Sequence, residues 1–433
     1  MSFSLNRMAV SLALTTALAG TSEAWAQQGT EEPNPNVTVQ ARPRPDYDPL
    51  GIRAGTFMIY PSLSLSGQYD DNVFADNEDE DSDFTAIISP RVTAQSNWSR
   101  HALGFGAGLT GAANYEYQSN DYLDAFLVSN GQLEITRDDL VSGFLRVDRL
   151  HEGRDDPDSD DNFDFDADDD NRGDLNRYWL PQADLQYRHN FARFFTVVGG
   201  SVRAYRYEDV GDDSNEDQRD RNEYAGRARL GFELSPRINL FAQGAYSYRD
   251  YDRDQNYGGE FIKRNSTGYQ ARVGTEVDIT GILFGELALT YSKRDFDENQ
   301  FKDTDGFGGN GSLTWNITPL TTIILNLNSE IAETTVQFQG DVASSRFENS
   351  AELDVTHELL RNVLLNANTS FQRDDFEDTA RTDHIWRAGA GVTYLINRNL
   401  SLDANYEFST RSSDAEGARY DRNLFLVGVT VKL

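Results

Sequence analysis

The sequence predicts an all-β protein, a transmembrane antiparallel β-barrel of about eighteen strands with short periplasmic turns and long acidic extracellular loops. Three observations support this prediction: apolar and polar residues alternate in strand-length segments, tight turns alternate with long acidic loops, and the composition suits a barrel. Hydrophobic residues make up only 38% of the 433 residues, yet Tyr (20) and Phe (25) are abundant. A barrel with a wet interior needs apolar residues on one face only, with aromatic girdles at both interfaces.

The alternation is clearest towards the C-terminus. In segment 423–433, Phe425, Val427 and Val431 share one face, and the segment runs as a strand to the last residue. Since successive side chains of a strand point to opposite faces, one face meets lipid and the other the lumen. A mid-strand carboxylate facing lipid would cost about 2–4 kcal/mol, so the polar faces are expected to meet water. The candidate lumen-facing residues are Glu286, Asn366, Asn368, Asp403, Asn405 and Glu407.

Turn residues divide the chain into hairpins that repeat with a period of roughly forty residues. The predicted strands are 57–68, 84–97, 102–116, 123–137, 140–151, 178–191, 194–208, 223–235, 238–250, 261–279, 282–296, 305–317, 321–335, 345–358, 362–374, 383–396, 399–411 and 420–433. An even count places both termini on the periplasmic side. About sixteen strands is the alternative, if an early pair is misassigned.

The long loops carry much of the net charge of −32, which argues against a nucleic-acid partner. The largest predicted loop, 152–177, is dense in Asp. Such clusters could bind Ca²⁺, but the spaced ligand pattern of a formed calcium loop is missing, so a solvated loop is the better interpretation. Although this loop is long enough to fold into the lumen, its carboxylate density argues against stable inward packing.

The N-terminal region divides into two predicted segments. Residues 1–26 have the charged, apolar and Ala-x-Ala parts of a signal peptide cleaved after Ala26, which implies export to the cell outer membrane. Residues 27–55 form a Pro-rich periplasmic segment that is expected to be extended or disordered. The barrel itself is expected to span 56–433. The chain has no cysteine, which excludes disulfides and thiolate metal sites.

No residue pattern predicts an enzyme. His151 stands beside Glu152 and Asp155, as a rim catalytic group would, but such proximity is expected by chance in so acidic a chain. No catalytic, cofactor-binding or metal-binding residues are therefore assigned, and no cofactor is expected.

Several short stretches resemble a known family. Residues 44–57, 60–63, 69–74, 89–92 and 96–101 resemble the opening of the outer-membrane beta-barrel porin family called beta-barrel porin 2. The resemblance implies a Gram-negative, proteobacterial outer-membrane barrel. Some members lie among genes for exopolysaccharide production, which implies a role in polymer export or cell-surface assembly. The family has no established catalytic residues.

Two classes of function remain open. The first is a porin-like transport channel for small solutes, or an exopolysaccharide-export accessory, because a barrel of about eighteen strands encloses a water-filled lumen unless it is plugged. The second is a non-conducting structural barrel whose acidic loops meet ions, lipopolysaccharide or partners. The expected partners are outer-membrane lipid and lipopolysaccharide, the barrel-assembly machinery, and polysaccharide or small solutes. The oligomeric state is left open.

Overall fold

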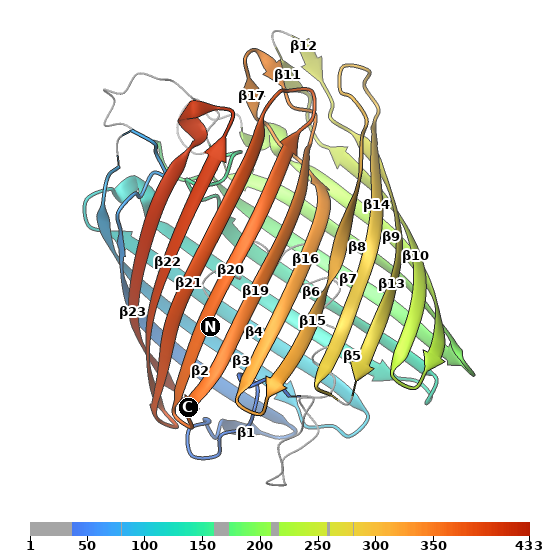
Figure 1. Ribbon diagram of the computed structural model, residues 1–433, viewed down its shortest axis with the longest axis vertical. Coiled ribbons are helices and arrows are strands. Elements are labelled where there is room, and N and C mark those ends of the chain that lie inside the picture. Colours follow the sequence, from blue (N-terminus) through green and yellow to red (C-terminus); the bar gives the residue numbers. More distant parts are fainter. Residues whose placement is uncertain (1–36, 79, 160–172, 209–215, 258–259, 280) are drawn as a thin grey trace.

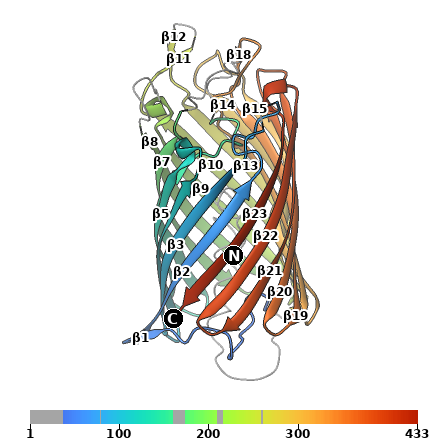
Figure 2. The ribbon, with the colours of Figure 1, turned by 90° about the vertical axis from the view of Figure 1, so that its left-hand side faces the viewer.

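The computed structural model describes residues 37–78, 80–159, 173–208, 216–257, 260–279 and 281–433, which form a β-barrel (Figure 1). The predicted signal peptide lies outside these residues. The barrel is wider in the view of Figure 1 than in the perpendicular view of Figure 2, so its cross-section is flattened. No helix in the described ranges has the length and apolar character needed to cross a membrane.

Eighteen of the described strands form a closed antiparallel ring, as predicted. In order around the barrel they are β2 (Phe57–Asp70), β3 (Asp83–Ser96), β4 (His101–Asn114), β5 (Tyr122–Glu134), β6 (Asp139–His151), β7 (Arg177–Phe191), β8 (Phe194–Glu208), β9 (Arg221–Ser235), β10 (Ile238–Tyr251), β13 (Ser266–Ile279), β14 (Leu283–Phe296), β15 (Thr304–Thr318), β16 (Thr321–Ala332), β19 (Arg346–Leu360), β20 (Val363–Phe376), β21 (Thr382–Asn397), β22 (Leu400–Ser413) and β23 (Tyr420–Lys432).

The remaining described elements are short. They are β1 (Ile52–Ala54), which pairs with β2, the hairpin strands β11 (Gln255–Tyr257) with β12 (Glu260–Ile262) and β17 (Gln337–Phe338) with β18 (Asp341–Val342), and the 3₁₀ turns η1 (Gln118–Asn120), η2 (Glu216–Arg219) and η3 (Glu416–Ala418). The two hairpins rise above the barrel at its long-loop end (Figures 1 and 2). The predicted strand 261–279 was therefore too long, because the chain leaves the barrel between β12 and β13.

The ring closes where β2 pairs with β23, and Figure 2 shows these two strands side by side. The register places Ser64 opposite Thr430, and their hydroxyl groups are hydrogen-bonded at 2.8 Å. Arg422 also donates to the Asp70 carboxylate across this seam. Because every strand then has a partner on both sides, the ring has no free edge.

Apolar side chains cover the outside of the ring rather than filling a central core. Leu289 of β14 is 72% exposed, whereas its neighbour Thr290 is 1% exposed. The tight turns lie at the opposite end from the long loops (Figure 1). In one of them Gly281 adopts a φ of +66°, which favours glycine, and its N–H donates to the Asp278 carboxylate at 3.0 Å. The alternating pattern and the turn residues together account for the barrel.

Candidate functional site

The polar faces of the strands surround the interior of the barrel. On β22, Leu402 and Tyr406 are exposed on one face, whereas Ser401, Ser409 and Arg411 on the other are buried. Arg411 and Arg387 of β21 also contact Asp155, which follows β6 on a different side of the ring. Such contacts can be made only through the interior, so the polar faces meet the lumen and the apolar faces meet lipid.

Five of the six predicted lumen residues lie together on β20 and β22. Asp403 accepts a hydrogen bond from Thr393 Oγ1 at 2.7 Å, and Asn366 accepts one from Thr356 Oγ1 at 3.3 Å. The other members of this group are Asn368, Asn405 and Glu407.

Two glycines of β21 make room for the amide side chains of this group. A Cβ atom at Gly389 would collide with the side chain of Asn368, and one at Gly391 with the side chain of Asn405. The strand between β20 and β22 therefore contributes backbone rather than side chains here, and a polar surface of amides and carboxylates spans three strands.

The sixth predicted residue, Glu286 of β14, lies apart from the others. Its carboxylate accepts two hydrogen bonds from Arg229 of β9, at 2.6 and 2.9 Å. Glu276 accepts a third hydrogen bond from the same guanidinium at 3.0 Å. The charge of Glu286 is therefore compensated, unlike that of a carboxylate that faces water alone.

Arginines line the interior opposite this polar surface, and none of them is among the residues that the sequence predicted to face the lumen. We call the following set the arginine wall: Arg203, Arg227, Arg229, Arg249, Arg272 and Arg294 of β8 to β14. Some are paired, for example Arg227 with Asp184 at 2.7 Å. Arg272 makes no ion pair with any residue in the described ranges. The signal for this wall was present in the sequence, because each arginine occupies a polar position of the alternation.

Carboxylates are concentrated on the facing strands. We call the following set the acidic wall: Glu348, Glu352, Asp354, Asp374, Asp383, Asp403 and Glu407 of β19 to β22. The lumen thus has two walls of unlike charge. A polar solute inside it meets a transverse field, which low-dielectric walls strengthen.

The described first part of a long loop, residues 152–159, reaches across the interior at the extracellular end. L3, the loop 152–176, joins β6 to β7. Its Asp155 lies 3.3 Å from Arg387 Nη2. Its Asp158 accepts hydrogen bonds from Thr334 Oγ1 at 2.5 Å and Thr335 N at 2.8 Å. The expectation that carboxylate density prevents inward packing was wrong for the described part of L3. Arginine and threonine residues far away in the chain donate hydrogen bonds to those carboxylates.

The base of L3 is fixed by Glu152, which is buried. Arg219 donates to both of its carboxylate oxygens, at 2.7 and 2.9 Å, and Tyr207 Oη lies 3.1 Å away. Burial raises the pKa of Glu152 to about 7, with Asp156 and Asp158 acting in the same direction and Arg219 opposing them. This carboxyl group can therefore change its charge near neutral pH.

The N-terminal segment, residues 37–50, lies against the periplasmic end. Val39 is fully buried and its N–H donates to Thr322 Oγ1 at 2.9 Å. Arg44 forms an ion pair with Glu358 at 2.8 Å, and both side chains are at most 10% exposed. Arg398, in the turn between β21 and β22, donates to the Pro45 carbonyl at 2.7 Å. The expectation of an extended or disordered segment was wrong for this part, because single residues dock it to three hairpins.

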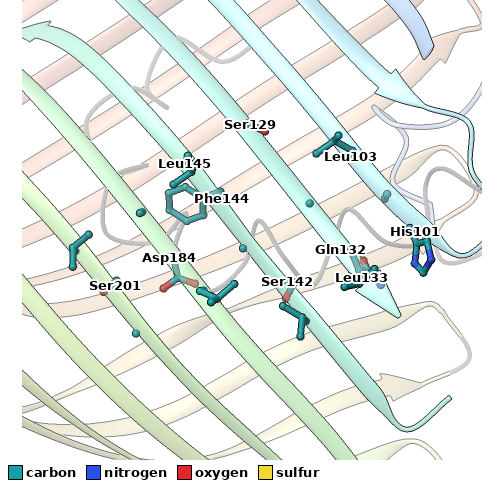
Figure 3. Close-up of a pocket in the computed structure, with 18 of the residues that line it drawn as sticks. His101, Leu103, Ser129, Gln132, Leu133, Ser142, Phe144, Leu145, Asp184 and Ser201 are labelled. Carbon is teal, nitrogen blue, oxygen red and sulfur yellow. The ribbon is translucent and has the colours of Figure 1, made fainter. Parts of the chain in front are cut away.

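A hollow of about 870 Å³ lies on the outer wall of β4 to β9. It is formed where small residues such as Gly131, Gly143 and Gly200 interrupt the apolar surface between larger side chains, and Figure 3 labels Leu133 and Leu145 among those that line it. Because it opens towards lipid, it is no part of the route through the barrel.

The rim histidine has a partner other than the two that sequence reasoning considered. His151 Nδ1 lies 2.9 Å from Asp124, and its ring stacks on Tyr122 with centroids 3.9 Å apart. Glu152 is held by Arg219 instead. In the part of the chain that the structure describes, no group of three or more His, Asp or Glu side chains could hold a metal ion.

Comparison with known proteins gives a family and several similar folds. Residues 44–433 match the family described as Putative beta-barrel porin 2. No curated protein matches the chain. Among solved structures, OpdL of Pseudomonas aeruginosa is 14% identical, with a TM-score of 0.43 over 88% of this chain and 100% of that one. OpdK of P. aeruginosa with vanillate (11%, TM-score 0.42, 87% and 99%) and a BenF-like porin from Pseudomonas fluorescens Pf-5 (13%, 0.43, 87% and 99%) are similar to the same extent. These likenesses carry no argument about the solute.

Proposed function

This chain belongs to the beta-barrel porin 2 family, whose members are porin-like outer-membrane barrels and not enzymes, and from that premise we propose that it conducts small polar solutes. The observation that carries the proposal is that residues 152–159 of L3 reach across the lumen. Asp155 and Asp158 hold L3 at arginines of β19 to β22, so the open route is narrower than the ring of strands. A loop that narrows the lumen selects solutes by size.

The two charged walls support a polar solute rather than an apolar one. Carboxylates of the acidic wall and guanidinium groups of the arginine wall can exchange hydrogen bonds with hydroxyl, amine or carboxylate groups in passage. We propose that the six predicted residues, Glu286, Asn366, Asn368, Asp403, Asn405 and Glu407, line this route.

The same geometry favours small solutes over an exopolysaccharide chain. A polymer would have to thread past L3 and also past the N-terminal segment, which is docked at the opposite mouth. A small solute can pass without complete displacement of L3 or of the N-terminal segment. A role as an exopolysaccharide-export accessory therefore requires a larger rearrangement than a role as a solute channel.

Conductance in planar lipid bilayers tests the proposal. Asp158→Asn removes the charge that Arg346 faces at 3.7 Å and weakens the hydrogen bonds from Thr334 and Thr335. Charge-assisted hydrogen bonds contribute about 1.5–3 kcal/mol, so L3 should leave the lumen more often and single-channel conductance should rise. Asp254→Asn, an exposed position in the loop between β10 and β13, is the matched control and should conduct like the wild type.

Two results would count against this function. A correctly closed wild-type barrel that never conducts would support the structural-barrel alternative. Equal conductance for the wild type, Asp158→Asn and Asp254→Asn would mean that L3 does not narrow the route.

A further inference from the structure

A small cavity at the extracellular rim lies on the outside of the barrel. This cavity, the rim pocket, measures about 390 Å³ and is lined by Asp121, Tyr122, Leu123, Ala125, Arg149 and Arg177. It lies where β5, β6 and β7 meet their long loops. Unlike the lumen, this position faces the outer leaflet of the membrane.

The surface around the rim pocket is apolar on its membrane side. Leu123 is 52% exposed, and Leu127, four residues further into the membrane on the same face of β5, is 61% exposed. Trp179 of β7, opposite Arg149 in the register, is 43% exposed. Aliphatic and indole surface just below a polar rim suits acyl chains near their headgroup.

The two arginines of the rim pocket differ in their partners. Arg149 is fixed by Glu208, which accepts from its Nε at 2.9 Å and its Nη2 at 2.6 Å. Trp179 Nε1 donates to the same carboxylate at 2.8 Å, so Glu208 accepts three hydrogen bonds from these two residues.

Arg177 lies opposite Glu208 in the β7–β8 register and is attracted by its charge, but within the described ranges it forms no ion pair with that carboxylate. Its one described hydrogen bond is a long contact of 3.4 Å from Nη2 to the Asp121 carbonyl. Its Nε is buried without a hydrogen-bond partner in the ranges that the structure describes. The buried Nε cannot reach a ligand, but Nη1 forms no hydrogen bond in those ranges, so the outer edge of this guanidinium is a site for an anion that can accept two hydrogen bonds.

We propose that the rim pocket binds a phosphate group of an acylated outer-leaflet glycolipid, the lipid A part of lipopolysaccharide. Arg177 donates to the phosphate, the Arg149–Glu208 pair holds the neighbouring wall in place, and the acyl chains lie along Leu123 and Leu127. The outward position selects a lipid over a solute in the lumen. The exposed apolar strip selects a lipid over free phosphate, because free phosphate gains nothing from it.

Binding of purified lipid A to the full-length barrel in detergent tests this proposal, with native mass spectrometry as the readout. Arg177→Gln removes the charge but keeps an amide donor, and should weaken binding about tenfold, since one charge-assisted contact is lost. Arg137→Gln, in the exposed periplasmic turn between β5 and β6, is the matched control and should bind like the wild type.

Two further probes separate the possible ligands. Dephosphorylated lipid A should bind the wild type and Arg177→Gln equally and weakly. Inorganic phosphate should not compete with lipid A at matched concentration. Equal lipid A binding by Arg177→Gln, Arg137→Gln and the wild type would overturn the proposal. Competition by inorganic phosphate would overturn the assignment to a lipid. Each variant is verified to be a closed barrel by comparing unheated and heated samples on an SDS gel, where the difference in migration should equal that of the wild type.

Discussion

Both mouths of the barrel are narrowed by a segment that an ion pair holds to the strands, but the segment carries the negative partner at one mouth and the positive partner at the other. At the extracellular mouth, a carboxylate of L3 contacts Arg387 of β21. At the periplasmic mouth, Arg44 of the N-terminal segment contacts the Glu358 carboxylate of β19. The Asp155 and Arg387 side chains are 15% and 21% exposed, while those of Arg44 and Glu358 are 5% and 10% exposed. Salt screens exposed pairs more than buried ones, so the Asp155–Arg387 pair is more easily loosened than the Arg44–Glu358 pair.

The largest effect is expected at the periplasmic mouth. Arg44→Gln removes the cation that is paired with the buried Glu358 carboxylate, although the charge of Arg42 still acts on it, and breaking a buried ion pair costs about 3–5 kcal/mol. The N-terminal segment should then undock. Since the chain has no cysteine, Val39→Cys reports undocking through its reaction with a water-soluble thiol reagent. We expect slow labelling in the Val39→Cys protein and fast labelling when Arg44→Gln is added.

Arg53→Gln, at an exposed position of β1, is the control in the same Val39→Cys background. It should label as slowly as the parent. Slow labelling of the Arg44→Gln protein would show that other contacts hold the segment, and the contrast between the two mouths would then be lost.

The next effect is a pH dependence at the extracellular mouth. Burial raises the pKa of Glu152 from the ordinary 4.5 to about 7 while L3 is docked. The docked state therefore binds the proton more tightly, so docking is strongest below pH 4.5 and weakens as the pH rises through 7. The difference amounts to about 3 kcal/mol. Conductance should increase between pH 5 and pH 8 as L3 loosens.

Glu152→Gln should abolish this pH dependence, because the amide does not titrate. The charged or titratable groups that surround the position are Arg219, Tyr207, Asp156 and Asp158. Of these, the two aspartates would have to account for any pH dependence that survives in Glu152→Gln. A full pH response in that variant would contradict the role of Glu152.

The smallest effect concerns ion selectivity. The acidic wall and the acidic loops should give a modest preference for cations, which the arginine wall offsets. Glu407→Gln should shift the reversal potential under a salt gradient towards zero, whereas Glu298→Gln in an exposed loop should not. The preference should fade near 1 M salt, where the Debye length is about 3 Å. Anion selectivity of the wild type would reverse this account.

The barrel could be predicted from the sequence because its causes are local. Each strand is specified by its own alternation and each hairpin by its own turn, as the Leu400–Ser413 strand and the turn at Gly281 illustrate. The break between β12 and β13 was missed although residues 263–265 are Lys, Arg and Asn, and strands disfavour Lys and Asn. Periodicity does not show where a strand leaves the barrel.

The closures of the two mouths could not be predicted in the same way. Asp158 is held by Thr334 and Arg346, and Arg44 by Glu358, partners that are more than 170 residues away in the chain. The sequence shows each charge but not which distant charge receives it. The arginine wall could not be predicted for a different reason: the net charge of −32 indicates an acidic chain as a whole, whereas the arginines share the polar positions of the alternation with the carboxylates.

The pairing of β2 with β23 also has a consequence for how the chain folds. The hydrogen-bonded residues Ser64 and Thr430 are 366 positions apart, so closing the ring carries the largest loop-closure entropy of any strand pair. Until it closes, β2 and β23 each present an unpaired edge that can add strands from another chain. The pairing of β2 with β23 thus ends the aggregation-prone stage, and a chaperone or assembly factor that shields these two edges would protect the chain until the ring closes.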